Sequence, residues 1–188
     1  MPGQMFGPYE LRGLLGRGGM GEVHRAYDHS QAREVALKLL PAALAADEGF
    51  VERFRRESYA AARLNDPHVI PIHRYGDIDG RLYIDMRLVE GVDLGKLLER
   101  DGPLPPARAV SFVTQAAEAL DAAHAAGLVH RDVKPSNLLL TGQDFVYLVD
   151  FGIAHVVGVT TRGKALTATG ATIGTLDYMA PERFSGTG

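Results

Sequence analysis

The chain has 188 residues, of which 46% are hydrophobic and 23% are charged, and this composition is typical of a globular protein with a core. The net charge of −3 gives no overall basic field, so we expect no nucleic-acid partner. The absence of cysteine excludes disulfides, thiolate metal sites and cysteine nucleophiles. The first residues do not resemble a secretory leader, and no apolar run approaches the ~20 residues of a membrane helix, so we expect a cytoplasmic chain without a membrane segment.

The first part of the chain alternates in the manner of β-strands. Strands are expected at 9–15, 22–28, 34–40, 70–75 and 82–88, with turns at 30–31 and 79–80. A helix is expected over 47–64, because Phe50, Phe54, Ala61 and Leu64 recur at helical spacing. Residues 1–89 are therefore predicted to form a five-stranded antiparallel sheet with one helix.

Helices dominate beyond residue 89. The sequence predicts a short helix over 94–100 and a long one over 105–126, with short apolar runs at 138–140 and 146–149 and a loop-like region from 151. The apolar face of the long helix is expected to comprise Val110, Val113, Ala117, Leu120 and His124. The predicted fold class is α+β, with a small β-rich part and a larger helical part that meet near 89–91.

Residues 15–23 read LGRGGMGEV, in which Gly16, Gly18 and Gly21 form a G-x-G-x-x-G pattern. This pattern is compatible with a dinucleotide site, with a lid over the phosphates of ATP, or with a plain turn. A dinucleotide fingerprint opens a helix, whereas the residues after Gly21 alternate like a strand. The sequence therefore favours a hairpin over the loop of a dinucleotide-dependent oxidoreductase.

A lysine and a glutamate occupy positions that their patterns assign to the interior. Lys38 lies in the apolar strand EVALKLL, and Glu57 lies on the apolar stripe of the helix over 47–64. Taken alone, Lys38 is better explained as a side chain that extends its ammonium to the surface, and Glu57 is the residue that changes this interpretation. Because buried charges need partners, we predict an ion pair between Lys38 and Glu57, with the ammonium available to bind phosphate oxygens.

Polar and charged residues gather in two nearby motifs, which are HRDVKPSN at 130–137 and DFG at 150–152. Asp150 directly follows an apolar strand. Its carboxylate and the amide oxygen of Asn137 are suitable ligands for a hard cation such as Mg²⁺. A polar surface loop is the alternative interpretation, but His, Arg, Asp, Lys and Asn within eight positions make it a poor one.

With these residues in view, the chain resembles a eukaryotic-type protein kinase domain of the Ser/Thr branch. The matching motifs, in the order of the family, are GRGGMGEV at 16–23, VALK at 35–38, Glu57, HRDVKPSN at 130–137, DFG at 150–152 and APE at 180–182. The local sequence is most similar to that of bacterial transmembrane-type kinases, especially actinobacterial ones. The resemblance implies a two-lobed fold that transfers the γ-phosphoryl group of ATP to Ser or Thr of protein substrates.

The resemblance also assigns roles. Gly16, Gly18 and Gly21 would offer backbone N–H groups to the phosphates, and Lys38, held by Glu57, would contact the α- and β-phosphates. Asn137 and Asp150 would hold Mg²⁺ or Mn²⁺. Asp132 would accept the proton of the substrate hydroxyl, Lys134 would neutralise the transferred group, and Thr175 would contact Asp132. The adenine would lie among Leu15, Val23, Ala36, Met86, Arg87, Val89 and Leu139.

Regulation and extent follow from the same resemblance. Arg131 precedes Asp132, as in kinases that are activated by phosphorylation, and Thr167 and Thr169 match autophosphorylation sites. Related bacterial kinases pair through their small lobes, so the resemblance is compatible with a homodimer through this lobe, although the sequence does not determine the oligomeric state. The chain ends six residues after Glu182, before the later helices of the family, and we expect it to be a fragment. A catalytically impaired ATP-binding or scaffold module is the alternative.

Overall fold

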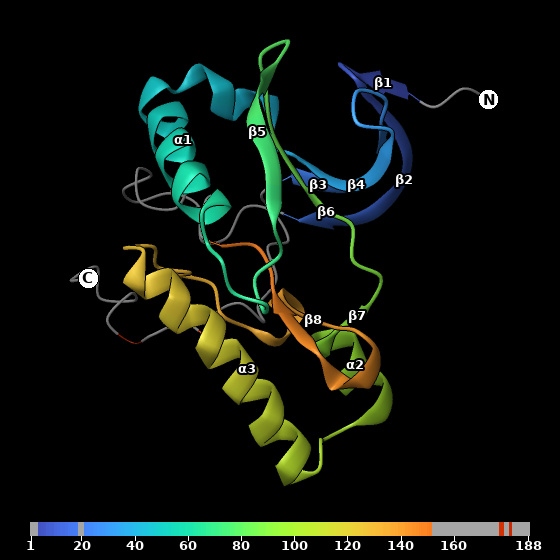
Figure 1. Cartoon of the computed structure of the whole chain (residues 1–188), viewed down its shortest axis with the longest axis vertical. Coiled ribbons are helices and arrows are strands. Elements are labelled where there is room, and N and C mark those ends of the chain that lie inside the picture. Colours follow the sequence, from blue (N-terminus) through green and yellow to red (C-terminus); the bar gives the residue numbers. More distant parts are fainter. Residues whose placement is uncertain (1–3, 19–20, 152–176, 179–180, 182–188) are drawn as a thin grey trace.

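The computed structural model describes residues 4–18, 21–151, 177–178 and 181. Its β-rich part and its helical part lie at opposite ends of the long axis, and the segment that follows β6 leads from one to the other (Figure 1). The β-rich part contains strands β1–β6 and helix α1, and the helical part contains α2, α3 and strands β7–β9. This is the α+β architecture that the sequence predicts.

The main sheet is antiparallel and has the strand order β1-β2-β3-β4-β6-β5. Its strands span Gln4–Phe6, Tyr9–Gly18, Gly21–Asp28, Arg33–Leu39, Ile72–Ile78 and Arg81–Arg87 for β1 to β6. The five strands expected from the sequence are β2 to β6. The sheet has six strands rather than five because Gln4–Phe6 pairs with the start of β2, an arrangement for which three residues carry little sequence signal.

The sheet curls around a small core of its own. Tyr9, Ala26, Val35, Leu37 and Leu39 are buried in this core, and the partly buried Phe6, Leu11, Ile78 and Tyr83 pack against it. The turn after β1 closes onto the end of β5, since a Cβ placed on Gly7 would lie 2.9 Å from Ile78 Cδ1. Asp85, with no exposed surface, is held inside this core by the hydroxyl of Tyr9, which donates to Asp85 Oδ2 at 3.1 Å.

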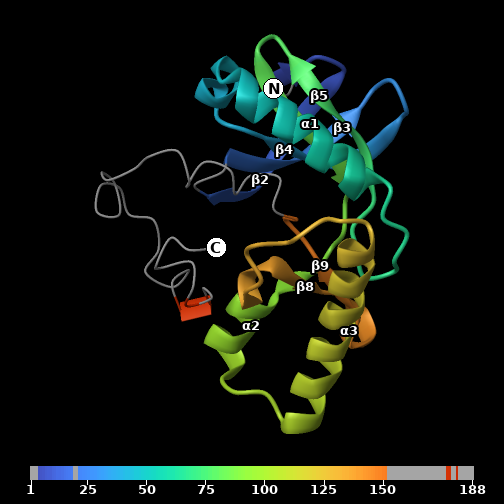
Figure 2. The ribbon, with the colours of Figure 1, turned by 90° about the vertical axis from the view of Figure 1, so that its left-hand side faces the viewer.

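Helix α1 spans Glu48–Ala62 and packs against β5, in front of the sheet in Figure 2. The carboxylate of Asp47 caps it by accepting the backbone N–H of Phe50 at 2.9 Å. Phe50, Phe54 and Ala61 of the predicted stripe are buried, whereas Leu64 is half-buried and follows the end of the helix. Glu57 shares this buried face, so a carboxylate points into the interior between the two parts of the molecule.

The helical part is built on a second, three-stranded sheet of order β7-β8-β9, formed by Val92–Asp93, Leu138–Leu140 and Val146–Leu148. Helices α2 (Leu94–Asp101) and α3 (Pro106–Ala125) are joined to it, and α3 packs against β9. Short 3₁₀ turns occupy Ala42–Ala46, Pro135–Asn137 and Gly142–Asp144. Within the described residues, neither of these helices nor α1 is both long and apolar enough to cross a membrane.

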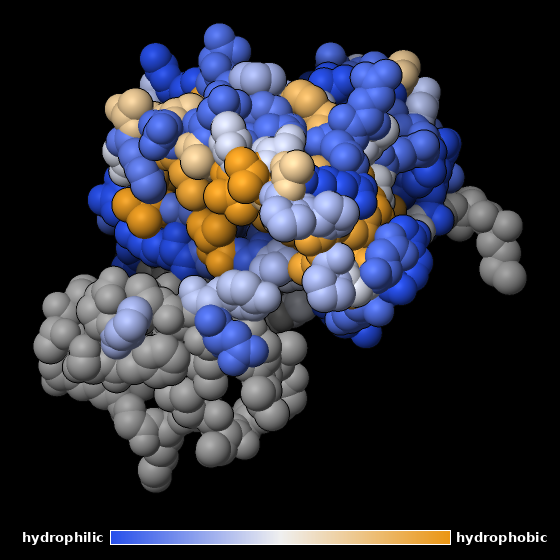
Figure 3. Space-filling model, turned by 90° about the horizontal axis from the view of Figure 1, so that it is seen from below, coloured by the Kyte–Doolittle hydropathy of each residue, from blue (hydrophilic) through white to orange (hydrophobic). Residues whose placement is uncertain are grey.

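The buried face of α3 differs from the predicted one. Phe112, Ala116, Ala119 and Ala123 are buried, whereas Val110 and Val113 are each 65% exposed. The helix is apolar on both faces, and the β8–β9 hairpin packs on the face with small side chains, which allow a close approach. Figure 3 views the molecule from this end and shows apolar side chains at its surface.

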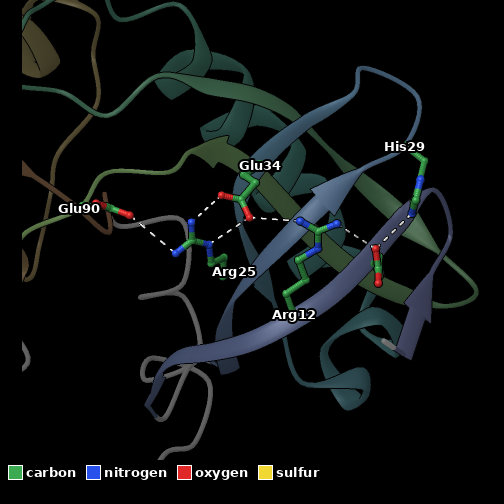
Figure 4. A network of polar contacts seen from close by, with 6 residues as sticks. Arg12, Arg25, His29, Glu34 and Glu90 are labelled. Carbon is green, nitrogen blue, oxygen red and sulfur yellow. Dashed lines mark hydrogen bonds and ion pairs between the residues drawn. The ribbon is translucent and has the colours of Figure 1, made fainter. Parts of the chain in front are cut away.

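Charged side chains form a network over the outside of β2, β3 and β4 (Figure 4). Arg25 on β3 donates to both carboxylate oxygens of Glu34 on β4, and Arg12 on β2 donates to the same Glu34 at 3.3 Å. Arg25 also lies 3.6 Å from the carboxylate of Glu90, in the segment that joins the two parts. These side chains are partly to fully solvent-accessible, so each pair contributes only about 0–1 kcal/mol.

Candidate active site

The glycine motif forms the turn of the β2–β3 hairpin, as predicted. Gly16 lies opposite Val23 and Gly18 lies opposite Gly21 in the antiparallel register. Gly21 has a φ of 115°, and a Cβ on it would lie 2.1 Å from the carbonyl oxygen of Leu39. A strand rather than a helix therefore follows Gly21, which rules out the dinucleotide fingerprint at this position.

Gly16 and Gly18 differ from Gly21 in their surroundings. Among the described residues nothing lies within 4 Å of a Cβ built on either glycine. Packing thus requires glycine at position 21 but not at 16 or 18. The open space leaves the backbone at these two positions accessible to a ligand, as expected for a loop that binds phosphates.

The predicted adenine-contacting residues come from several strands. In the register, Ala36 lies directly opposite Met86, and Val23 lies opposite Lys38. Leu139 lies on β8 and approaches the segment between the two parts, since its Cδ1 would lie 3.2 Å from a Cβ on Gly91. Among the other members of the set, Leu15 is 49% exposed, Arg87 is exposed and Val89 is half-buried. Their contacts with an adenine stay predictions.

The structure corrects the predicted partner of Lys38. The ammonium of Lys38 donates to Asp150 Oδ1 at 2.7 Å, with the lysine side chain 8% exposed and the aspartate 40% exposed. Desolvation tends to raise the pKa of the Asp150 carboxyl, but the adjacent ammonium outweighs it and holds this pKa below its ordinary value. Asp150 is therefore ionised at neutral pH and faces the one lysine of β4.

Glu57 has a different partner from the one predicted. Its Oε1 accepts a hydrogen bond from Nη1 of Arg131 at 2.9 Å, and its side chain is 9% exposed. Its other oxygen, Oε2, is buried and has no hydrogen-bond partner within the described part of the chain. The predicted Lys38–Glu57 pair was wrong for this conformation because each group has a nearer opposite charge on the helical part.

The carboxylate of Asp132 is held by two neighbours. Lys134 Nζ lies 2.8 Å from Asp132 Oδ2, and the side-chain amide of Asn137 donates to the same oxygen at 3.0 Å and to the Asp132 carbonyl at 2.7 Å. The side chains of Asp132 and Lys134 are 17% and 21% exposed, so both groups are fixed yet reachable. The structure thus brings together Asp132, Lys134 and Asn137, three of the residues that were predicted to form the site.

His130 ties this loop to the segment that carries Asp150. The backbone N–H of Asp132 donates to His130 Nδ1 at 3.2 Å, so Nε2 carries the proton that is donated to the Val149 carbonyl at 2.8 Å. Burial lowers the pKa of the His130 imidazole below its ordinary value of 6.5 and keeps the ring neutral. This positioning role was not predicted, although His130 stands inside the motif.

A main-chain hydrogen bond places the two predicted metal ligands next to each other. The N–H of Val149, the residue before Asp150, donates to the carbonyl of Asn137 at 3.0 Å. Since the Asn137 amide nitrogen is directed at Asp132, the amide oxygen is left for a cation. A carboxylate and an amide oxygen fit a hard divalent ion that takes its remaining ligands from phosphates and water.

Two residues of the site have unusual backbone conformations. Arg131 has a φ of 65° and Asp150 a φ of 60°, both in the left-handed region that side chains other than glycine seldom adopt. Such conformations cost roughly 1–3 kcal/mol each and are concentrated at functional sites. The contacts around Arg131 and Asp150 therefore hold both residues in conformations that are unfavourable by themselves.

A small apolar cavity that the sequence did not indicate lies between the sheet and β9. It is lined by Lys38, Leu40, Ile70, Ile72, Ile84, Met86, Leu148, Val149, Asp150 and Phe151. The lining residues come from β4, β5, β6 and β9 and from the segments next to these strands, which are far apart in the chain, so only the tertiary fold reveals the cavity. The predicted phosphorylation sites Thr167 and Thr169, and also Thr175 and Glu182, lie outside the described residues.

Comparisons with known proteins agree with this geometry. The family profile described as the protein kinase domain matches residues 9–188. The serine/threonine-protein kinase PknE of Mycobacterium tuberculosis is 58% identical over 183 residues, which are 97% of this chain and 32% of that protein. PknH of the same species is 56% identical over 97% of this chain and 29% of its own length. The chain thus spans about a third of these relatives.

A solved structure gives the same result for the fold. The crystal structure of the Mycobacterium tuberculosis PknI kinase domain matches with a TM-score of 0.73 and 42% identity. The match covers 82% of this chain and 63% of that chain. The overall fold of the matched part is therefore similar to that of an experimentally determined kinase domain.

Proposed function

The chain belongs to the protein kinase family, and we propose that the protein transfers the γ-phosphoryl group of ATP to serine or threonine hydroxyls of protein substrates. The observation that carries this proposal is the convergence of Lys38, Asp132 and Asp150 from separate elements at the boundary between the two parts. This set supplies a cation for phosphates, a carboxylate for a proton and a carboxylate for a metal.

Asp132 is the proposed proton acceptor. It accepts the proton of the substrate hydroxyl as the hydroxyl oxygen bonds to the γ-phosphorus and the bond to the β-phosphate oxygen breaks, releasing ADP. Lys134, 2.8 Å from Asp132, lies where it can neutralise charge on the transferred group. The hydrogen bonds from Asn137 and to His130 hold Asp132 in position for this transfer.

Asn137 and Asp150 would hold a divalent cation, Mg²⁺ or Mn²⁺. When bound, such an ion neutralises the charge of the phosphates and orients them. Lys38 would then bind phosphate oxygens, and the accessible backbone of Gly16 and Gly18 would donate to them. Leu15, Val23, Ala36, Met86 and Leu139, with the backbone at Arg87 and Val89, would enclose the adenine.

Control by phosphorylation is part of the proposal. Phosphate on Thr167 or Thr169 would give the guanidinium of Arg131 a doubly charged partner. Thr175 would contact Asp132 and favour serine or threonine as the acceptor.

Phosphate transfer to a basic model protein tests the proposal. We expect Asp132→Asn to lower the initial rate at least about 100-fold, because general-base contributions are typically that large. Asp121→Asn is the matched control, since Asp121 is an exposed acid on α3 and is not one of the proposed site residues. Equal rates for the wild type and Asp132→Asn would overturn the proposal, and binding of ATP with no transfer would favour a scaffold module instead.

A further inference from the structure

Strand β5 contains a β-bulge at His73, where it pairs with β6. The antiparallel register places Ile72 opposite Met86. It places Arg74 opposite Asp85, the residue directly before Met86. His73 is therefore an extra residue of β5 that has no position opposite it on β6, and one extra residue of this kind defines a bulge.

The bulge decides which face of the sheet Ile72 occupies. Successive side chains of a regular strand point to opposite faces, so without the bulge Ile72 would share the face of Arg74 and Ile78. Ile78 packs against the small core inside the sheet. Ile72 instead packs with Tyr75 against the larger core that includes the buried face of α1, and it lines the apolar cavity together with Met86.

The bulge also brings His73 to the face that carries Asp85. His73 Nδ1 lies 3.0 Å from Asp85 Oδ1, and the hydroxyl of Tyr9 donates to Oδ2 of the same carboxylate at 3.1 Å. Because a carboxylate accepts hydrogen bonds, Nδ1 is the nitrogen of His73 that carries the proton. Burial and the nearby carboxylate raise the pKa of the Tyr9 phenol above its ordinary value, so this hydroxyl keeps its proton and donates.

We propose that His73 and Asp85 are positioning residues for the nucleotide site, because their hydrogen bond fixes the bulge and thereby holds Ile72 and Met86 at the wall of the cavity. We call this hydrogen-bonded pair the bulge lock. Its role rests on the proposed kinase function, in which Met86 contacts the adenine of ATP. The bulge lock adds two residues that set the affinity for ATP through their neighbours.

Register explains the buried carboxylate of Asp85 better than stability does. Asp85 has no exposed surface, and the side chain of His73 is 20% exposed. A buried charged pair often stabilises a protein no more than apolar residues of the same size, but an arrangement that removes one partner is strongly unfavourable. Regular alternation of β5 would place His73 opposite Met86 on the apolar face and leave Asp85 without this donor. The bulge lock therefore favours the bulged register.

Two substitutions at position 73 test the bulge lock. The amide nitrogen of asparagine can take the place of Nδ1, so His73→Asn keeps a donor to Asp85, whereas His73→Leu removes it. We expect His73→Leu to raise the KM for ATP, and the Kd of a non-hydrolysable ATP analogue measured by calorimetry, about tenfold, with kcat within about twofold of the wild type. His73→Asn should keep both constants within about twofold of the wild type. A purely structural role would lower the melting temperature and leave KM unchanged.

A double substitution tests whether His73 acts through Ile72. Ile72→Ala alone should also weaken binding of the analogue, because it shortens the side chain at the cavity wall. His73→Leu combined with Ile72→Ala should weaken binding no more than the larger of the two single changes, since both remove the same contact. Fully additive effects of the two changes would overturn the action through Ile72.

Arg74→Gln is the matched control on the same strand. Arg74 Nη1 lies 3.8 Å from Asp28 Oδ2, and in the bulged and the regular register alike Arg74 shares the face of Asp85. This variant should therefore lower the melting temperature and leave the KM for ATP unchanged. If His73→Leu does not fold, Asp85→Leu removes the same hydrogen bond with an apolar side chain of similar size and should raise KM in the same way.

The outcomes separate the bulge lock from the kinase proposal. An affinity for the analogue in the folded leucine variant within about twofold of the wild type would overturn the bulge lock. Equal weakening by His73→Leu and His73→Asn would overturn it as well, because the asparagine keeps the donor. Absence of phosphate transfer in the wild type would count against the kinase proposal alone, since the comparison of analogue affinities does not depend on transfer.

Discussion

Replacing Gly21 with alanine tests whether packing requires this glycine of the loop, in contrast to the loop glycines that leave space for a ligand. At a φ of 115°, an alanine lies in a backbone region reserved for glycine, at a cost of about 1–3 kcal/mol. Its Cβ would also lie 2.1 Å from the Leu39 carbonyl oxygen, and displacing β4 adds an overpacking cost of about 1–3 kcal/mol. We expect a total loss of roughly 2–6 kcal/mol.

Thermal unfolding followed by circular dichroism measures this loss. For a chain of this size, 1 kcal/mol corresponds to about 2–4 °C, so Gly21→Ala should lower the melting temperature by roughly 10 °C. Gly16→Ala is the control, because a Cβ at Gly16 meets nothing within 4 Å of the described residues, and its free energy of unfolding should change by less than about 0.5 kcal/mol. Equal melting temperatures for the two variants would refute this explanation of the motif.

Three further predictions concern stability. Burial lowers the pKa of the His130 imidazole below 6.5, so at a pH below 6.5 the unfolded chain binds more protons than the folded chain. The free energy of unfolding should therefore be greatest above pH 6.5 and fall as the pH is lowered through 6.5, and it should fall less in His130→Asn. Identical pH dependence of urea unfolding for the two proteins would contradict this. Tyr9→Phe should cost about 1–3 kcal/mol in urea unfolding, because Asp85 is fully buried and loses a donor; an unchanged midpoint would show that the hydrogen bond is dispensable. Ala119→Leu should lower the free energy of unfolding by about 1–3 kcal/mol, because Ala119 is fully buried. Val113→Ala should have little effect, because Val113 is 65% exposed. If Val113→Ala were the more destabilising of the two, α3 would bury the face predicted from the sequence instead.

The elements of the fold were predictable because local signals specify them. Alternation and turn residues locate β2 to β6, and in particular Asp79 and Gly80 both adopt the positive φ that a tight hairpin requires. The helical spacing of Phe50, Phe54 and Ala61 identifies α1. Strand β1 was missed because its three residues form a strand only through pairing with β2.

The sequence did not predict which face of α3 is buried or which partners the buried charges have. Helix α3 is apolar on two faces, and only the tertiary position of the β8–β9 hairpin decides that Ala119 is buried while Val113 is exposed. The sequence identified Lys38 and Glu57 as buried charges in need of partners. It did not identify those partners, because they lie 112 and 74 residues away along the chain and depend on how the two parts are placed.

The most direct test of the site is the affinity for a non-hydrolysable ATP analogue, measured by calorimetry with and without Mg²⁺. If Lys38 and Asp150 share one nucleotide–metal site, the wild type should bind with strong dependence on Mg²⁺. Lys38→Met should weaken binding at least tenfold, and Asp150→Asn should remove the dependence on Mg²⁺. Equal affinities and equal Mg²⁺ dependence in all three proteins would contradict the placement of the active site.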